Sequence, residues 1–419
     1  MTVALAFSRP ASETITECRS CGSDRLDVFL DLGDMPLADR LVRTAELSAP
    51  EPRFPLSVAF CEDCTLVQIT ETVDPEILFA QDYPYYSSFS PALLAHSRAN
   101  ALDLVERRRL GPASLVVELA SNDGYLLKNY VERDIGVLGI DPATGPAETA
   151  RRAGVPTLNL FFTREIARRL AAEGRRADVV HANNVLAHVA DTNGFVAGLR
   201  MILKDDGVAV IEAPYVLPLV EHVEFDTIYH EHLCYFSVTA LDRLFRRHGL
   251  YLNELKHLAI HGGSLRLYVE PVERVGTSVS GQLARERALG MDGIAFYRDL
   301  SSRVGTLKRD LAALLYRLKA EGKSIAAYGA AAKGATLVNH VGIGRDLVDF
   351  VVDRNIHKQG RHMPGQAIPI LAPEALVERR PDYVLLLAWN FADEIMAQQQ
   401  AYRDLGGRFI IPVPEPRIV

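Results

Sequence analysis

The chain has 419 residues, more than one hydrophobic core usually serves, so its length predicts two or three domains. Its 48% hydrophobic and 24% charged residues are typical of a globular protein, and its formal net charge of -7 argues against binding nucleic acid through a basic surface. No run of about 18 apolar residues predicts a membrane span, and residues 1–14 lack the pattern of a secretory signal. We therefore expect a cytoplasmic protein without a membrane or nucleic-acid partner.

Four of the five cysteines lie in the first region, which ends near residue 72, and form two Cys-x-x-Cys pairs. The pairs are Cys18 with Cys21 and Cys61 with Cys64. Thiolates at this spacing can bind one tetrahedral zinc ion, and four cysteines leave no open coordination position. We expect a structural zinc ion, with a redox pair or unconnected thiols as the alternatives. Cys234 stands apart, and we expect it to be a packed, inert thiol.

The second region, from about Val73 to Pro271, alternates apolar runs with helical stretches, which predicts a parallel doubly wound sheet. The predicted strands are Leu115–Leu119, Gly136–Ile140, Ala177–His181 and Gly207–Glu212. The first strand ends in a turn of small residues from Ala120 to Gly124, and a helical pattern begins at Tyr125. Such a turn lets the backbone approach a cofactor beyond the carboxyl end of the strand.

An acid and two asparagines follow the next two strands. Asp141 comes 23 residues after Glu118, close to the spacing of about 20 at which an acid accepts hydrogen bonds from ribose hydroxyls. Asn183 and Asn184 offer amides near an adenine or methionine group. The turn lacks the G-x-G-x-x-G pattern of dinucleotide sites, which favours S-adenosylmethionine over NAD. An ordinary turn in an α/β sheet is the alternative.

The third region opens with a long amphipathic stretch, Gly281 to Glu321, whose apolar residues recur at spacings of three and four, and Gly322 suits its end. The strands predicted after it are Ser324–Tyr328, Leu347–Val352 and Tyr383–Leu387. The small-residue turn Gly329–Gly334 suits phosphate binding through backbone amides, with Lys333 as a positive charge. A tight strand–helix connection, or an NAD-dependent oxidoreductase or epimerase using this turn, is the alternative.

Several further motifs occur in a fixed order along the chain. They are Met35-Pro-Leu-Ala-Asp39, Tyr83-Pro-Tyr85-Tyr86-Ser87, Glu118 through Gly124, Asn183-Asn184-Val-Leu-Ala-His188, Tyr229-His-Glu231-His232, His261-Gly-Gly-Ser264-Leu-Arg266, Tyr328-Gly-Ala-Ala-Ala-Lys333-Gly334, Val352-Asp353 and Lys358-Gln-Gly360-Arg361. With the cysteine pairs, they resemble the S-adenosylmethionine-dependent sugar C-methyltransferases that build branched deoxysugars on dTDP-hexoses. The chain departs from the resemblance at Ala120, where many relatives have Gly, and we expect only modest crowding there.

The resemblance implies an α/β protein of three domains. A zinc-binding domain would span residues 1–75, a class I methyltransferase domain residues 76–272, and a carboxyl-terminal α/β domain with a long linking helix residues 273–419. The last two would be doubly wound, Rossmann-like domains. A dTDP-4-keto-deoxyhexose would lie between them, and the protein would be a monomer or a weak homo-oligomer.

Methylation of a sugar carbon needs a carbanion, which a base can form only beside a ketone. His232 is our candidate base, because an unperturbed histidine titrates near pH 6.5. Tyr229 is the candidate donor to the enolate oxygen, with His188 beside it, and Glu231 would hold a sugar or imidazole group. The resemblance places Tyr83 near the reaction centre, with interdomain packing as the alternative. A structural role is the alternative for any single histidine, and we expect it for His230.

The remaining predicted site residues fall into two sets. We assign cofactor binding to Tyr86, Ser87, Glu118, Ala120, Asn122, Gly124, Asp141, Pro142, Asn183 and Asn184. We assign substrate binding to Ser264, Arg266, Tyr328, Ala330, Lys333, Gly334, Asp353, Lys358 and Arg361. Methylation at oxygen or nitrogen, and a zinc-organised binding module without catalysis, remain as alternatives.

Overall fold

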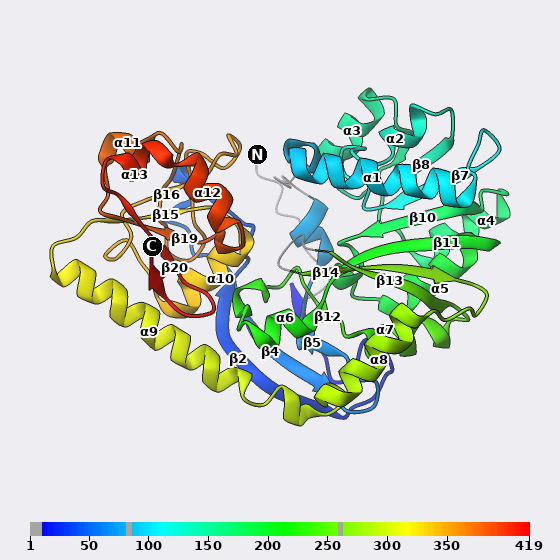
Figure 1. Ribbon diagram of the computed structural model, residues 1–419, viewed down its shortest axis with the longest axis horizontal. Helices are drawn as coiled ribbons and strands as arrows, with labels where there is room; N and C mark the ends of the chain where they lie inside the picture. Colours follow the sequence, from blue (N-terminus) through cyan, green and yellow to red (C-terminus); the bar gives the residue numbers. More distant parts are fainter. Residues whose placement is uncertain (1–10, 81–85, 259–262) are drawn as a thin grey trace.

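The computed structural model describes residues 11–80, 86–258 and 263–419. Its three main sheets are set side by side, with the amino-terminal sheet at the base between two α/β lobes (Figure 1). That basal sheet is antiparallel and has the order β12-β5-β4-β2. Its strands are β2 (Leu26–Pro36), β4 (Arg53–Cys61), β5 (Val67–Ile69) and β12 (Cys234–Tyr235). Two short pairs accompany it: β1 (Ser12–Thr14) with β6 (Glu71–Val73), and β3 (Val42–Arg43) with β17 (Arg361–His362).

The middle lobe contains a seven-stranded sheet of order β13-β14-β11-β10-β7-β8-β9. Its strands are β7 (Leu115–Leu119), β8 (Gly136–Ile140), β9 (Thr157–Leu158), β10 (Ala177–Asn183), β11 (Leu203–Pro214), β13 (Tyr251–Leu258) and β14 (Ser264–Glu270). Only β14 runs antiparallel to its neighbours, β11 and β13. Because all other pairings are parallel, the strands β7, β8 and β10 end at one edge of the sheet, as the sequence predicts.

Helices cover both faces of this sheet because its strands alternate apolar residues toward each face. Val116 and Val179 pack toward α1 (Pro91–Arg108) and α2 (Lys128–Val131), whereas Val117 and Val180 belong to the larger core on the opposite face. The other helices of this part of the chain are α3 (Thr144–Arg152), α4 (Arg164–Ala172), α5 (Thr192–Ile202), α6 (Val216–Glu221), α7 (Val238–Arg247) and α8 (Thr277–Leu289).

The carboxyl-terminal lobe contains a six-stranded sheet of order β18-β16-β15-β19-β20-β21, parallel except for β21. Its strands are β15 (Ile325–Tyr328), β16 (Val351–Val352), β18 (Ile370–Leu371), β19 (Tyr383–Leu386), β20 (Arg408–Ile411) and β21 (Arg417–Ile418). Its helices are α10 (Ala332–Val341), α11 (Ala375–Arg379), α12 (Ala392–Gln398) and α13 (Gln400–Asp404). The strand predicted at Leu347–Val352 is shorter than expected. Only Val351 and Val352 of this stretch pair with the neighbouring strands β15 and β18.

The amphipathic stretch predicted from Gly281 to Glu321 is not one helix. α8 ends at Leu289, Gly290 adopts a left-handed φ of 74°, and a turn with the 3-10 segment Ile294–Phe296 leads into α9 (Leu300–Ala320). The break lets the fully buried Tyr297 ring pack against aromatic rings of the basal sheet. Because the helical spacing of apolar residues occurs both in α8 and in α9, the sequence pattern does not reveal the break between them. α9 then spans the base of the carboxyl-terminal lobe (Figure 1) and ends before Gly322, as predicted.

The helical pattern predicted from Tyr125 also begins later, since residues 125–127 form turns and α2 starts at Lys128. Among the described helices, none combines the length and apolar character that crossing a membrane requires.

Candidate active site

The turn after β7 has a strained backbone that its small residues permit. Ala120, Asn122 and Gly124 have φ values of 55°, 48° and 80°. A Cβ atom on Gly124 would lie 3.0 Å from Val155 Cγ2, so glycine is needed there for close packing as well as for its backbone conformation. The left-handed conformation at Ala120 explains why glycine would be the easier residue.

Asp141 closes this turn from the neighbouring strand. Its Oδ2 accepts a hydrogen bond from the Asn122 amide at 2.8 Å, and its Oδ1 accepts one from the Ala143 amide at 2.8 Å. Burial raises the pKa of Asp141 to about 6, against the lowering effect of these two amides. Asn159 donates its side-chain amide to the carbonyls of Asp141 and Pro142 at 3.0 and 2.9 Å.

The segment before α1 lies over the same turn. The Ser87 amide donates to Asn122 Oδ1 at 2.9 Å, and the Ser88 amide donates to Asp123 Oδ2 at 3.1 Å. A Cβ atom at Gly145 would lie 2.6 Å from the Tyr86 hydroxyl, so this glycine makes room for the ring. The Tyr86 ring centroid also lies 6.2 Å from that of His357 in the carboxyl-terminal lobe. Tyr83 falls outside the described residues.

Glu118 is buried in the sheet, one residue before the end of β7. Neither carboxylate oxygen has a hydrogen-bond partner among the described residues, and burial raises its pKa well above the ordinary range, with Asp141 and Asp123 adding to the shift. At the end of β10, Asn184 has a φ of 52° and its amide donates to the Glu212 carbonyl at 2.7 Å, beside Asn183.

The loop before β12 brings together three of the predicted catalytic side chains. The Tyr229 hydroxyl lies 2.9 Å from His232 Nε2, and His232 Nδ1 lies 3.0 Å from the Thr227 carbonyl oxygen. Because a carbonyl oxygen only accepts, Nδ1 carries a proton, which leaves Nε2 of the neutral ring as an acceptor. The His188 ring lies 4.8 Å from the His232 ring, and burial lowers the pKa of His188 to about 4.

His230 and Glu231, the other two residues of the motif Tyr229–His232, have different surroundings. Burial, with a smaller contribution from the nearby Asp39 carboxyl, raises the pKa of Glu231 to about 8, so this side chain is largely protonated at neutral pH. His230 Nε2 lies 3.1 Å from the Pro55 carbonyl oxygen and its side chain is fully buried, as expected for a structural histidine. Asp39 received no role from the sequence, although it ends the Met35–Asp39 motif.

The turn after β15 resembles the first one in its hydrogen bonds. Gly329 has a φ of 97°, and the Ala330 amide donates to Asp353 Oδ2 at 2.8 Å. Lys358 donates from Nζ to the Ala330 carbonyl at 2.7 Å. A Cβ atom on Gly334 would lie 2.9 Å from Leu387 Cβ, so this glycine serves close packing of α10 on the sheet.

Lys333 has partners within the protein. Its Nζ donates to Asn390 Oδ1 at 3.0 Å and lies 4.1 Å from the centroid of the Trp389 ring. Trp389 Nε1 in turn donates to Asp226 Oδ2 at 2.6 Å. Trp389 is the one tryptophan of the sequence and follows β19 at the carboxyl edge of the sheet, which is the signal that could have identified it.

Ser264 and Arg266, which we predicted to bind the substrate, lie in β14 and apart from the turn after β15. Arg266 donates from Nε to Glu212 Oε1 at 2.7 Å, and its Nη2 lies 2.9 Å from His96 Nε2, beneath α1. Ser264 begins the same strand, β14, and is buried. Arg361 belongs to β17, which joins the carboxyl-terminal lobe to β3. Tyr328 is the buried last residue of β15.

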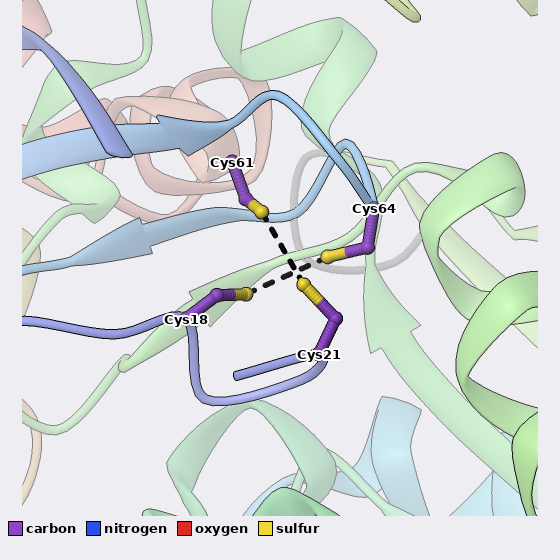
Figure 2. A group of neighbouring side chains, drawn as sticks. All are labelled: Cys18, Cys21, Cys61 and Cys64. Atoms are coloured by element: carbon purple, nitrogen blue, oxygen red, sulfur yellow. Dashed lines mark hydrogen bonds between the residues drawn. The ribbon is translucent and has the colours of Figure 1, made fainter. Parts of the chain in front are cut away.

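The four cysteines of the two pairs converge at one end of the basal sheet, as Figure 2 shows. Their sulfur atoms all lie within 4.8 Å of one another, with 3.5 Å between Cys18 and Cys64 and 3.5 Å between Cys21 and Cys61. Ligands of a tetrahedral zinc ion at about 2.3 Å would lie about 3.8 Å apart. The sulfur positions therefore fit such an ion.

Family models match three consecutive parts of the chain. They describe a proposed zinc-binding domain at residues 18–79, a methyltransferase domain at residues 93–255 and a C-methyltransferase C-terminal domain at residues 259–414. The C-methyltransferase NovU of Streptomyces niveus is 36% identical over 408 residues, which cover 97% of each protein. The chain belongs to the C-methyltransferase family. The seven-stranded sheet of this C-methyltransferase, with β14 reversed between β11 and β13, is the predicted class I S-adenosylmethionine-dependent methyltransferase fold.

Other similarities of this C-methyltransferase are local. The ubiquinone biosynthesis O-methyltransferase of Bartonella quintana is 29% identical over 97 residues, or 23% of this chain and 39% of that protein. The structure of magnesium protoporphyrin IX methyltransferase from Synechocystis PCC 6803 with bound SAH is 14% identical, with a TM-score of 0.34 over 42% of this chain and 81% of that chain. Family membership confirms the methyltransferase prediction over the oxidoreductase and non-enzymatic alternatives.

Proposed function

We propose that this C-methyltransferase transfers the methyl group of S-adenosylmethionine to the carbon beside the keto group of a dTDP-4-keto-deoxyhexose, at carbon 3 or carbon 5. The observation that carries the proposal is the hydrogen-bonded series from Tyr229 through His232 to the Thr227 carbonyl. In the neutral ring this series makes Nε2 the acceptor nitrogen, which is what removal of a proton beside a carbonyl requires.

The reaction we propose begins when the substrate enters between Tyr229 and His232. The Tyr229 hydroxyl turns from His232 Nε2 to the keto oxygen, and Nε2 accepts the proton of the adjacent carbon. Electrons of that C–H bond pass into the enolate, whose oxygen Tyr229 stabilises by its hydrogen bond. S-adenosylmethionine, when bound, would supply an electrophilic methyl group to the enolate carbon and leave as S-adenosylhomocysteine. The His188 ring, uncharged above about pH 4, packs against His232 without adding a repelling charge.

We further propose that the turn after β7 holds the cofactor. Each oxygen of Asp141 accepts one amide and retains a second lone pair, so its carboxylate can still accept hydrogen bonds from ribose hydroxyls. The residues we assign to the cofactor are Tyr86, Ser87, Ala120, Asn122, Gly124, Asp141, Pro142, Asn183 and Asn184. Glu118 would act from within the sheet, by supporting the turn.

For the sugar nucleotide, we propose the turn after β15 and the loop that follows β16. Lys333 and Lys358 bring two positive charges to this edge, which suits a diphosphate. Lys333 and Lys358 now donate to the neutral oxygens of Asn390 and Ala330. A charged phosphate oxygen accepts a stronger hydrogen bond from an ammonium group and can replace them. Tyr328, Gly334, Asp353 and Arg361 belong to the same proposed site, and Ser264 and Arg266 remain predictions for it.

We propose that the four cysteines bind one structural zinc ion. Besides the sulfur geometry, the Gln68 side-chain amide donates to Cys18 Sγ at 3.1 Å, a contact that stabilises a thiolate. One zinc per chain by elemental analysis, and loss of the basal sheet on chelation, would support this site. A metal-free protein with an unchanged melting temperature would refute it.

The activity can be tested with methyl-labelled S-adenosylmethionine and a panel of dTDP-4-keto-deoxyhexoses, followed by NMR of the product. Carbon methylation requires removal of the substrate α-proton, which is followed in the absence of the methyl donor as exchange with solvent deuterium, whereas methylation at oxygen or nitrogen removes no α-proton. His232→Asn should reduce both turnover and exchange by about 100-fold or more. His222→Asn, at a histidine whose side chain is 57% exposed, is the matched control. Normal exchange in folded His232→Asn protein would refute the assignment.

A further inference from the structure

The loop that carries His232 is held by two different parts of the molecule. Its second half belongs to the basal sheet, because β12 pairs with β5 and the Ile69 amide donates to the Leu233 carbonyl at 3.0 Å. Its first half, the 3-10 segment Phe225–Thr227, packs against α10 of the carboxyl-terminal lobe. In Figure 1, α6 is drawn between α10, in the carboxyl-terminal lobe, and β12 of the basal sheet.

The His232 side chain joins these two halves. Its backbone lies two residues before β12, yet its Nδ1 hydrogen bond goes to the Thr227 carbonyl in the first half. The ring orientation therefore depends on where the first half sits relative to the second.

Two side chains of the carboxyl-terminal lobe hold the residues on either side of Thr227. Trp389 Nε1 donates to Asp226 Oδ2 at 2.6 Å, and Thr336 Oγ1 donates to the Ile228 carbonyl at 3.1 Å. Asp226 and Ile228 are fully buried, and Thr336 is 4% exposed. Water therefore has little access to replace either donor.

Lys333 also stabilises the position of the first half of the loop, the segment Phe225–Thr227. It lies over the Trp389 ring at 4.1 Å and contributes a positive charge close to the buried Asp226 carboxylate. The residue proposed to bind the sugar nucleotide thus contacts the tryptophan that anchors the loop.

We propose that Trp389 and Thr336 are positioning residues, which act from the carboxyl-terminal lobe to fix the Thr227 carbonyl and thereby the orientation and tautomer of His232. The inference rests on the proposed function of His232 as the base. It makes the arrangement of the base depend on the lobe proposed to bind the substrate, so that the base is correctly oriented only when this lobe is docked against the loop.

The test uses substitutions that remove one donor and little else. Thr336→Val removes the hydroxyl and keeps the shape, whereas Thr336→Ser keeps the hydroxyl and is the matched control. Trp389→Phe removes the indole N–H and keeps an aromatic face for Lys333. We expect Thr336→Val and Trp389→Phe to lower kcat by about 10- to 100-fold, with KM for both substrates within about twofold. Thr336→Ser should keep the parent kcat.

A readout without turnover separates this inference from the proposed function. The 15N resonances of His232, assigned by their loss in His232→Gln protein, should show the Nδ1–H tautomer in the parent and in Thr336→Val a mixture of tautomers. In the His232→Gln background, Thr336→Val should cause no further loss of activity.

Parent tautomer and parent kcat in both Thr336→Val and Trp389→Phe would overturn the inference, as would a loss confined to KM. If the parent protein exchanges no α-proton while the tautomer change is present, the proposed function fails and the positioning of His232 stands.

Discussion

The two α/β lobes contain the same strand–turn–acid arrangement at different places in the chain. In the middle lobe, Asp141 follows β8 and accepts the amide of Asn122 from the turn after β7. In the carboxyl-terminal lobe, Asp353 follows β16 and accepts the amide of Ala330 from the turn after β15. Each acid also accepts the amide two residues further on, at 2.8 Å in both cases.

The turns differ in what surrounds them. The first is covered by the Ser87 and Ser88 amides and continues through irregular turns before α2. The second leads directly into α10 and carries Lys333. In both units the acid accepts backbone amides of its own turns, so a ligand uses only the lone pairs that remain. The residues around each turn, rather than the acid, therefore separate the two proposed ligands.

We expect the strongest effect at Gly329, the residue directly after β15. Gly329 has a φ of 97°, and a Cβ atom there would lie 2.8 Å from Ala388 Cβ. Gly329→Ala should therefore lower stability by about 2–4 kcal/mol, from backbone strain and overpacking together. Thermal unfolding monitored by calorimetry tests this. A melting temperature equal to that of the parent would mean that this turn accommodates alanine as readily as the first turn does at Ala120.

Substitution of the two acids tests which ligand each turn serves. Asparagine offers one acceptor oxygen in place of two, so Asp141→Asn loses a charged acceptor and should raise the Kd for S-adenosylmethionine by about tenfold. Asp353→Asn should raise the Kd for the sugar nucleotide by a similar factor. Each variant should leave the affinity for the other ligand within about twofold by calorimetry. A crossed pattern would exchange the two assignments.

Cofactor affinity should depend on pH through Asp141. Its pKa is raised to about 6, and ribose hydroxyls donate preferentially to the ionised carboxylate. The Kd for S-adenosylmethionine should therefore fall by about threefold as pH rises from 5 to 7, and this change should be absent in Asp141→Asn. The same dependence in both proteins would assign the titration to another group.

The smallest effect is expected at the counterpart of Gly329 in the first unit. Ala120 already has a left-handed φ of 55°. Ala120→Gly relieves that strain but adds freedom to the unfolded chain, so stability should equal that of the parent or exceed it by up to about 1 kcal/mol. A loss above that amount, with reduced cofactor affinity, would show that the Ala120 methyl group makes a contact that supports the turn.

Much of the α/β architecture could be predicted because it depends on local patterns. β7 and β8 have the predicted ends, since a central parallel strand is an uninterrupted apolar run that stops at a turn residue. The amphipathic stretch from Gly281 was predicted less well. Its break at Gly290 depends on the packing of Tyr297 against Phe29 and Phe60, which lie far away in the sequence.

We could predict the sheet type, the cysteine pairs and the family motifs from the sequence, because strand periodicity, ligand spacing and motif order are properties of neighbouring residues. The folded structure was needed to see that β12 leaves the middle lobe to complete the basal sheet, and that Trp389 and Thr336 hold the loop of His232. It also shows that Arg266 pairs with Glu212. These contacts join residues 54 to 168 positions apart, and no local pattern encodes which of many buried donors will meet which acceptor.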